Sequence, residues 1–293
     1  MREPVPTSRL LECAAIDDQV RDWLDVMPAA VRGYAEKWDL HLGAPYEPGG
    51  NTAWVAPAVT PDGEQVVLKV GMRHPEADRE AAALRTWSGE GAVRLIEDDY
   101  DERSMALLLE RCEPGTALAA LPEPEQDTVI AAVLRRIWAT PWDEAHRFDP
   151  LSVLCRTWAD ETEERLASGG YPGDPGLVRT AIGLLRECPA RADDVLLGTD
   201  VHAENVLAAS REPWLLVDPK PFVGDAAYDV VQHLLNCRGR LVEDPIALTG
   251  RLSRLTGTPV GAVRRWTFAR AACELAWWPE LAPVVAALAS YAD

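Results

Sequence analysis

The first part of the chain carries a pattern of apolar positions that predicts a small α+β unit. Apolar residues recur at helical spacing over 20–34, which predicts a leading helix. Two β-rich runs over 53–70 flank Pro61-Asp62-Gly63, a turn sequence typical of an antiparallel hairpin. Helical character returns over 75–87, and two more strand-like runs surround an acidic turn before residue 112. We therefore expect an antiparallel sheet plus helix in this part of the chain.

After Glu113-Pro114-Gly115 the pattern becomes mainly helical, which marks a hinge. We expect two domains, residues 1–112 and 113–293. Only two short apolar runs, 195–197 and 214–217, interrupt the helical part. Helical periodicity predicts helices over 123–139, 153–168, 175–187, 225–237, 244–255, 260–278 and 281–291.

Length and composition describe an ordinary folded chain. Its 293 residues suffice for two domains with their own cores, and its 47% apolar and 26% charged residues are usual values. The six cysteines lack CxxC spacing, so neither a zinc site nor a disulfide framework is predicted. No apolar run approaches the roughly 18 to 20 residues that cross a bilayer, and the first residues lack the apolar stretch of a signal peptide. We therefore expect a cytoplasmic protein with no membrane partner.

The charge balance restricts the partners further. The chain has 47 acidic and 29 basic residues and a formal net charge of −18. Such a charge argues against nucleic acid as a partner. It favours encounter with cationic small molecules, although an acidic excess also simply keeps a protein in solution.

The most informative stretch, 196–220, contains Asp200, Asn205 and Asp218. Phosphoryl transfer needs a carboxylate that orients the attacking hydroxyl and accepts its proton, and oxygen ligands that hold Mg²⁺ on the nucleotide phosphates. These three residues supply such groups. Two apolar runs around a turn at 209–212 predict a hairpin that brings Asn205 and Asp218 together. Taken alone, Asp-x4-Asn is also open to ordinary loop and capping roles.

This stretch resembles the catalytic and metal-binding loops of aminoglycoside phosphotransferases, whose usual form is His-Gly-Asp-x-His-x-x-Asn followed by Ile-Asp. Asp-Pro-Lys at 218–220 and Gly-Asp-Ala-Ala-Tyr-Asp at 224–229 narrow the similarity to the streptomycin 6-kinase and hydroxyurea kinase branch. The resemblance implies an α+β, two-lobed protein-kinase-like fold, with a small N-lobe of antiparallel sheet plus helix and a larger, mainly helical C-lobe. It implies ATP and Mg²⁺ as cofactors, Asp200 as catalytic base, and Asn205 and Asp218 as metal ligands.

Two positions depart from the pattern of this family. Gly198-Thr199 stands where His-Gly is usual, which removes a packing group and not the base. Glu204 stands beside Asn205, where the family commonly has glycine, and the added carboxylate can change metal affinity or substrate choice. The resemblance gives Asp229 a structural role, bracing the catalytic loop from the following helix.

The first domain offers the other half of a nucleotide site. Lys69 lies in an apolar strand-like run and resembles the kinase lysine that contacts the α- and β-phosphates. It is one of only three lysines, with Lys37 and Lys220. Glu80 in the following helix matches the family's paired glutamate best, and Glu76 is the alternative by register. A strand-edge lysine with a solvated head is the structural alternative for Lys69.

Two further segments resemble nucleotide-contacting parts of kinases. Gly49 and Gly50 form a turn whose missing side chains allow the backbone to approach phosphates closely. No GxGxxG or Walker-type motif is present. The run 107–115 resembles the linker between kinase lobes, whose backbone groups hydrogen-bond adenine, and the backbone at Glu110 and Cys112 would make those bonds. Any edge strand leaving a domain is the plain alternative.

Candidate substrate residues lie on two predicted helices of the second domain. Glu161 and Glu164 belong to an acidic cluster on one helix, and Glu274 and Trp277 lie on another. Carboxylates and aromatic faces suit a ligand that carries amines or guanidinium groups. A solvated acidic face and core tryptophans are the structural alternatives.

Together these features predict an ATP-dependent kinase that transfers the γ-phosphoryl group to a hydroxyl of a small, cationic molecule. The resemblance implies streptomycin or a related aminoglycoside first, and hydroxyurea or an endogenous metabolite as alternatives. A nucleotide-binding pseudokinase is the rival from another class, motivated by the lost histidine and by Glu204. A protein kinase is disfavoured because no Ala-Pro-Glu segment follows Asp218.

Overall fold

The computed structural model describes residues 3–74, 77–143 and 148–292. It divides into two compact units. Unit 1 comprises Met1–Gly115 together with Ala209–Pro213, and unit 2 comprises Thr116–Ala208 and Trp214–Asp293. The short segment 209–213 therefore belongs to unit 1, although it is the tip of a hairpin whose strands lie in unit 2.

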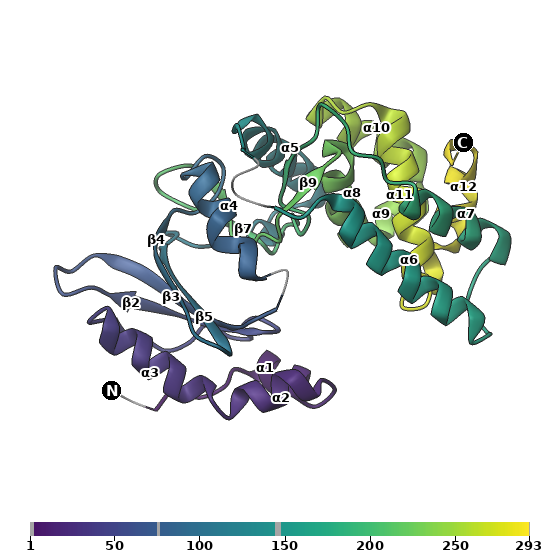
Figure 1. The fold of residues 1–293 in the computed structure, drawn as a ribbon. Coiled ribbons are helices and arrows are strands. Elements are labelled where there is room, and N and C mark those ends of the chain that lie inside the picture. Colours follow the sequence, from purple (N-terminus) through teal and green to yellow (C-terminus); the bar gives the residue numbers. More distant parts are fainter. Residues whose placement is uncertain (1–2, 75–76, 144–147, 293) are drawn as a thin grey trace. The chain divides into compact units, whose positions relative to one another are not determined.

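Unit 1 is built on a five-stranded antiparallel sheet with the strand order β1-β2-β3-β5-β4 (Figure 1). The strands are β1 His41–Leu42, β2 Ala53–Val59, β3 Gln65–Met72, β4 Leu95–Tyr100 and β5 Ser104–Glu110. The hairpin expected around Pro61-Asp62-Gly63 joins β2 to β3, with Val59 opposite Gln65. Gly63 has a φ of 89°, a conformation that glycine adopts without strain.

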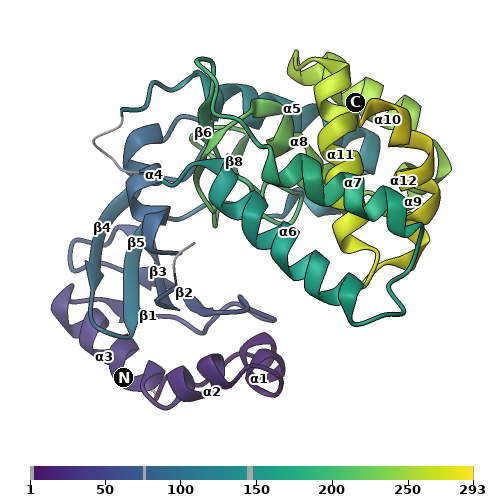
Figure 2. The same ribbon diagram turned by 45° about the vertical axis from the view of Figure 1, so that its right-hand side comes forward.

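Helices cover both faces of this sheet. On one face lie α1 Ser8–Ala14, α2 Asp18–Leu24 and α3 Met27–Lys37, drawn in purple, and α4 Glu80–Trp87 lies on the other (Figures 1 and 2). Trp23, Met27 and Val31 pack with Trp54 and Leu68 in one core. Because side chains alternate across a strand, Lys69 points to the opposite face from Leu68.

The single leading helix expected over 20–34 is wrong, because the apolar pattern continues across two helices. Helix α2 ends at Leu24 and α3 begins at Met27. Pro28 lies in the first turn of α3, where its missing N–H has no helical partner to lose. A new helix start at this point is therefore favourable.

Unit 2 is mainly helical, and most of its helices lie close to the expected ranges. Its helices are α5 Glu123–Ala139, α6 Leu151–Ala167, α7 Pro175–Arg186, α8 Ala226–Asn236, α9 Arg238–Glu243, α10 Pro245–Thr256, α11 Val260–Glu274 and α12 Ala282–Leu288. Helix α9 was not expected, and α11 ends four positions before the predicted 278. Among the described residues, no helix combines the length and apolar character required to cross a membrane.

Two short antiparallel pairs carry the polar loops of unit 2. β6 Val195–Leu197 pairs with β9 Phe222–Gly224. β7 Val206–Ala208 pairs with β8 Trp214–Leu216, with Val206 opposite Leu216. This second pair is the hairpin that the two apolar runs predicted.

Candidate active site

The loop between β6 and β7 is held in place from helix α8. The buried carboxylate of Asp229 accepts hydrogen bonds from the backbone N–H of Gly198 (2.9 Å) and of Thr199 (2.6 Å). Its Oδ2 also accepts from Trp138 Nε1 at 2.9 Å. Asp229 therefore braces the loop from the following helix, as expected.

Burial has a clear effect on the acidity of this brace. Desolvation raises the pKa of Asp229 to about 6, although the donors at Gly198, Trp138 and Thr199 oppose the rise. The charge of Asp200 raises it further. At neutral pH the carboxylate is ionised and can accept hydrogen bonds from all three donors.

Asp200 lies in this loop with its carboxylate in contact with two cationic or titratable side chains. Its Oδ2 is 2.7 Å from Lys220 Nζ, and its Oδ1 is 3.6 Å from His202 Nε2. The side chain of Asp200 is 18% exposed. Burial lowers the pKa of His202, although the carboxylates of Asp200 and Glu204 oppose this. A neutral His202 suits the packing role expected from the sequence.

The hairpin brings the two candidate metal ligands to the same end. Asn205 precedes β7 and Asp218 follows β8, and Val217 N–H donates to the carbonyl of Asn205 at 2.8 Å. Asn205 Nδ2 donates to the carbonyl of Asp200 at 3.0 Å and lies 3.4 Å from its Oδ2. Asp200, Asn205 and Asp218 thus converge within unit 2. The amide and carboxylate oxygens of Asn205 and Asp218 are the kind of ligand that hard cations prefer.

The departures at Gly198 and Thr199 have a local packing explanation. A Cβ added at Gly198 would lie 2.5 Å from Val201 Cγ2, so the space of a larger side chain is already filled. Thr199 has a φ of 45°, a conformation that a β-branched residue rarely adopts. Two hydrogen bonds hold Thr199 in this conformation. Its N–H donates to Asp229, and its Oγ1 donates to the carbonyl of Lys220.

In unit 1, Lys69 and Glu80 form a buried ion pair. Lys69 Nζ lies 2.8 Å and 2.6 Å from the two carboxylate oxygens of Glu80. Lys69 is fixed on β3, and Glu80 is the first residue of α4. The side chains are 8% and 2% exposed, so the strand-edge alternative with a solvated lysine head is wrong. Glu76, the alternative partner, lies outside the described residues.

The glycine turn lies in the connection from β1 to β2 and is packed against the N-terminal segment. Gly49 has a φ of 86°, and a Cβ there would lie 2.4 Å from Thr7 Oγ1. Ser8 donates to Glu47 Oε2 from its N–H and its hydroxyl, at 3.1 Å and 2.7 Å. Gly50 has no such positive φ. The open side of Gly49 is therefore filled by Thr7. This packing explains the need for glycine at position 49, and the sequence pattern did not predict it.

Glu110, at the end of β5, is clamped by an arginine that is distant in the sequence. Arg211 donates to both carboxylate oxygens of Glu110 at 2.8 Å and 2.9 Å. It also donates to the carbonyls of Gly89 and Ala92. Burial opposes ionisation of Glu110, but Arg211 and the N–H of Arg94 hold its pKa below the ordinary value. Nothing in the sequence pattern marked Arg211.

The linker cysteine has a different environment. Burial raises the pKa of the Cys112 thiol to about 12, and the charge of Glu110 adds to the rise. The thiol is therefore protonated at neutral pH. A role of Cys112 in binding adenine would have to use its backbone, as expected from its place in the linker.

The structure separates the four candidate substrate residues. Glu161 pairs with Arg165 at 3.1 Å, and Arg165 lies over the ring of Trp277, which is 65% exposed. Glu164 is exposed. Glu274 is buried and pairs with Arg270 at 2.7 Å. Glu161 and Trp277 thus share a neighbour, whereas the carboxylate of Glu274 is already neutralised inside the unit.

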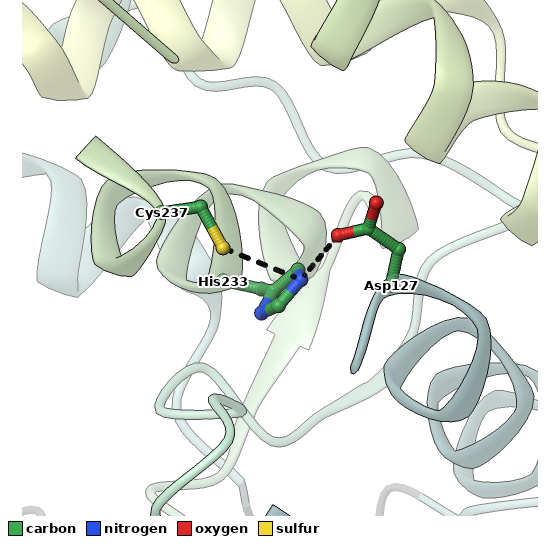
Figure 3. A group of neighbouring side chains, drawn as sticks. All are labelled: Asp127, His233 and Cys237. Carbon is green, nitrogen blue, oxygen red and sulfur yellow. Dashed lines mark hydrogen bonds and ion pairs between the residues drawn. The ribbon is translucent and has the colours of Figure 1, made fainter. Parts of the chain in front are cut away.

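A second group of possible metal ligands lies in unit 2. Asp127, His233 and Cys237 are buried with ligand atoms within 4.8 Å of one another (Figure 3). His233 Nε2 is 2.9 Å from Asp127 Oδ1 and 3.7 Å from Cys237 Sγ, as the dashed lines show.

The partners of Asp127 favour an ion-pair network over a metal site. Its carboxylate also accepts from Arg240 at 3.1 Å and 2.8 Å and from Arg251 at 2.7 Å. A cation would have to displace these donors and enter beside two guanidinium groups. Burial raises the pKa of Cys237 to about 12. The side chain is therefore a protonated thiol at neutral pH, whereas a metal binds the thiolate.

Comparison with known proteins gives a consistent result. The model of the aminoglycoside/hydroxyurea antibiotic resistance kinase family matches residues 41–281. Hydroxyurea phosphotransferase from Kitasatospora aureofaciens is 33% identical over 261 residues, 88% of this chain and 74% of that protein. Streptomycin 6-kinase from Streptomyces griseus is 32% identical over 214 residues, 73% of this chain and 68% of that protein.

A solved structure supports the fold. The structure of an amicoumacin kinase in complex with AMP-PNP, Ca²⁺ and Ami has a TM-score of 0.61 and 13% identity, covering 94% of this chain and 95% of its own. The expected α+β, two-lobed protein-kinase-like fold is confirmed, and the family resemblance drawn from the loop motifs is confirmed as well. The chain belongs to the aminoglycoside/hydroxyurea antibiotic resistance kinase family.

Proposed function

We propose that this kinase transfers the γ-phosphoryl group of Mg-ATP to a hydroxyl of a small molecule, with streptomycin or a related aminoglycoside as the first candidate. The observation that carries the proposal is the convergence of Asp200, Asn205 and Asp218 on one loop and hairpin of unit 2. Two streptomycin 6-kinases are 32% and 29% identical to this chain. The activity belongs in the cytoplasm, where ATP is made and held.

Asp200 is the group that orients the acceptor hydroxyl and takes its proton. Its carboxylate is partly exposed and fixed by Lys220 and by the Asn205 amide, as positioning of a nucleophile requires. Asn205 and Asp218 would hold the Mg²⁺, whose charge offsets that of the phosphates when bound. A divalent cation with a nucleotide analogue is present in the amicoumacin kinase structure, which supports this choice.

Unit 1 would bind the nucleotide. Lys69, held by Glu80, would contact the α- and β-phosphates, since a buried ammonium needs an anionic partner that keeps it oriented. Within the glycine turn, Gly50 would lie against the phosphates, because Thr7 already fills the open side of Gly49. The backbone N–H of Glu110 already donates to the carbonyl of Arg94 at 2.9 Å. Adenine recognition would therefore use the carbonyl of Glu110 and the backbone of Cys112.

The acceptor is the least constrained part of the proposal. The formal net charge of −18 suits a polycationic aminoglycoside. Hydroxyurea is the second candidate, because a hydroxyurea phosphotransferase is 33% identical to this chain. An amine-bearing acceptor at Glu161 and Trp277 would have to displace Arg165, which contacts both, so the exposed Glu164 is the better placed carboxylate.

The test is product analysis by mass spectrometry after incubation with Mg-ATP and a panel of aminoglycosides, hydroxyurea and simple sugars. We expect phosphorylated streptomycin, and we expect Asp200→Asn to lower turnover by about 1000-fold. Phosphohydroxyurea alone would select the second candidate. Turnover that survives in Asp200→Asn would refute the assignment of the base, and failure of the wild-type protein to bind ATP would refute the proposed function.

A further inference from the structure

Lys220 is fixed to the catalytic loop at three points, although no feature of the sequence predicts a role for it. Its backbone N–H donates to the carbonyl of Gly198 at 2.9 Å. Its carbonyl accepts from Thr199 Oγ1 at 2.5 Å. Its ammonium lies 2.7 Å from Asp200 Oδ2. The residue that follows the second metal-ligand candidate by two positions is therefore anchored beside the proposed base.

Stability alone does not account for this ion pair. The side chain of Lys220 is 35% exposed, and exposed pairs contribute only about 0 to 1 kcal/mol. The two backbone tethers restrict where the ammonium can lie, which is useful only if its position matters. Thr199 supplies one tether by adopting a left-handed φ of 45° that favours glycine. This chain accepts an unfavourable backbone conformation at the residue that holds Lys220.

We propose that Lys220 is a second cationic residue of the phosphoryl-transfer site, which orients Asp200 before the reaction and stabilises the terminal phosphate during it. This inference rests on the proposed function, because it takes Asp200 as the base. By the proposed function, the acceptor hydroxyl that attacks the γ-phosphorus is the one that Asp200 contacts. An ammonium 2.7 Å from that carboxylate would therefore lie close to the phosphoryl group that is transferred.

The charges change together during the transfer. The acceptor O–H bond breaks and its proton passes to Asp200, a bond forms between the acceptor oxygen and the γ-phosphorus, and the bond from phosphorus to the bridging oxygen breaks with its electrons going to ADP. An ammonium has three N–H donors, so Lys220 can contact Asp200 and an oxygen of the terminal phosphate at the same time. Its positive charge then stabilises the phosphoryl oxygens in the bound nucleotide and in the transition state.

The chain offers a matched control for this lysine. Lys37, on α3, pairs with Asp99 at 2.6 Å, and its side chain is 53% exposed. Lys37→Met removes an ion-paired lysine that is remote from the loop in sequence and lies in the other unit. We would compare Lys220→Met, Lys220→Arg and Lys37→Met with the wild-type protein and Asp200→Asn.

Two readouts are measured on these proteins. Calorimetric titration with ADP and with AMP-PNP, both with Mg²⁺, tests whether Lys220 senses the terminal phosphate and needs no acceptor. We expect Lys220→Met to weaken AMP-PNP binding about 10-fold and to leave ADP binding within about twofold. With a turned-over acceptor, we expect kcat to fall about 100-fold in Lys220→Met and to recover in part in Lys220→Arg.

Each outcome decides a separate question. Equal weakening of ADP and AMP-PNP with a lowered Tm would mean a structural role and would overturn the inference. The inference would also be overturned if Lys220→Met had the nucleotide affinities and the kcat of Lys37→Met while Asp200→Asn was inactive. A wild-type protein that binds neither nucleotide would overturn the proposed function itself, whereas an intact function with an altered AMP-PNP to ADP ratio supports Lys220 alone.

Discussion

At the scale of single residues, Asp229 shows how burial and hydrogen bonding compete around the catalytic loop. The ionised carboxylate accepts hydrogen bonds from two loop N–H groups and one indole N–H. It nevertheless lies in the interior, where a charge is unfavourable. Its pKa is raised to about 6 from 3.8. The folded state therefore binds a proton on Asp229 more tightly than the unfolded state does.

Replacement of this carboxylate tests the balance directly. Below pH 3.8 Asp229 is protonated in both states, and between 3.8 and about 6 only the folded state keeps the proton. Its contribution to stability is thus complete at low pH and is lost as the pH rises through about 6, by about 3 kcal/mol in total. We expect the unfolding free energy of the wild type minus that of Asp229→Asn to fall over this window.

Urea unfolding from pH 4 to 7.5 measures this difference. The variant also leaves one loop N–H facing an amide NH₂ group, so we expect kcat to fall about 10-fold at pH 7.5. A difference in unfolding free energy that rises with pH would contradict the assigned direction of the pKa shift.

At the scale of elements, two ion-pair networks connect segments that are distant in sequence. Arg211, at the tip of the β7–β8 hairpin, holds Glu110 at the end of β5, 101 positions away. In unit 2, Asp127 on α5 contacts residues of α8, α9 and α10 through His233, Arg240 and Arg251. Each network is anchored on one partly or fully buried carboxylate.

Removal of the Asp127 charge should destabilise unit 2 strongly. Burial opposes ionisation, but His233, Arg240 and Arg251 hold the pKa of Asp127 well below its usual range. Its contribution to stability is present above the ordinary Asp pKa and is lost as the pH falls below it. We expect Asp127→Asn to lower the unfolding free energy by about 3 to 5 kcal/mol at pH 7, because two arginines lose their partner.

Chemical denaturation with a surface control separates this effect from a general loss of acidic charge. Asp160→Asn removes an exposed partner of Arg186 and should cost less than about 1 kcal/mol. If the cluster of Asp127, His233 and Cys237 holds no metal, a chelator should leave the Tm of the wild-type protein unchanged. A Tm that falls with chelator and returns with Zn²⁺, in wild type and not in Cys237→Ala, would instead identify a metal site.

At the scale of the whole molecule, the net charge of −18 distinguishes the two candidate acceptors. An acidic field raises the local concentration of a cationic substrate, and salt screens that attraction. Hydroxyurea is uncharged and should not sense it. The proposed preference for an aminoglycoside can therefore be tested through the salt dependence of kcat/KM, without knowledge of the binding pocket.

We expect kcat/KM for streptomycin to fall several-fold as NaCl rises from about 20 to about 300 mM, and kcat/KM for hydroxyurea to stay constant. Steady-state assays at fixed Mg-ATP measure both, and the salt dependence of the ATP KM is the control. Equal salt dependence for the two acceptors would assign the effect to nucleotide binding and would remove the charge argument for a cationic substrate.

The sequence by itself determined the features that depend on local pattern. Helix periodicity located most of unit 2, and the β7–β8 hairpin followed from two apolar runs around a turn, since pairing across a short turn is set by neighbouring residues. The order of Asp200, Asn205 and Asp218 identified the family. Apolar periodicity could not find the break between α2 and α3, because the core-facing positions continue across it.

Only the tertiary structure decided which distant side chains meet. The loop contacts of Asp229 were expected from the family resemblance, whereas Arg211 reaches Glu110 and Lys220 reaches Asp200 through contacts that no local pattern encodes. The inward position of Glu274 likewise depends on the packing of α11 and not on its spacing from Trp277. Motif spacing reports short-range geometry, whereas burial, ion pairing and pKa depend on neighbours that folding brings together from far along the chain.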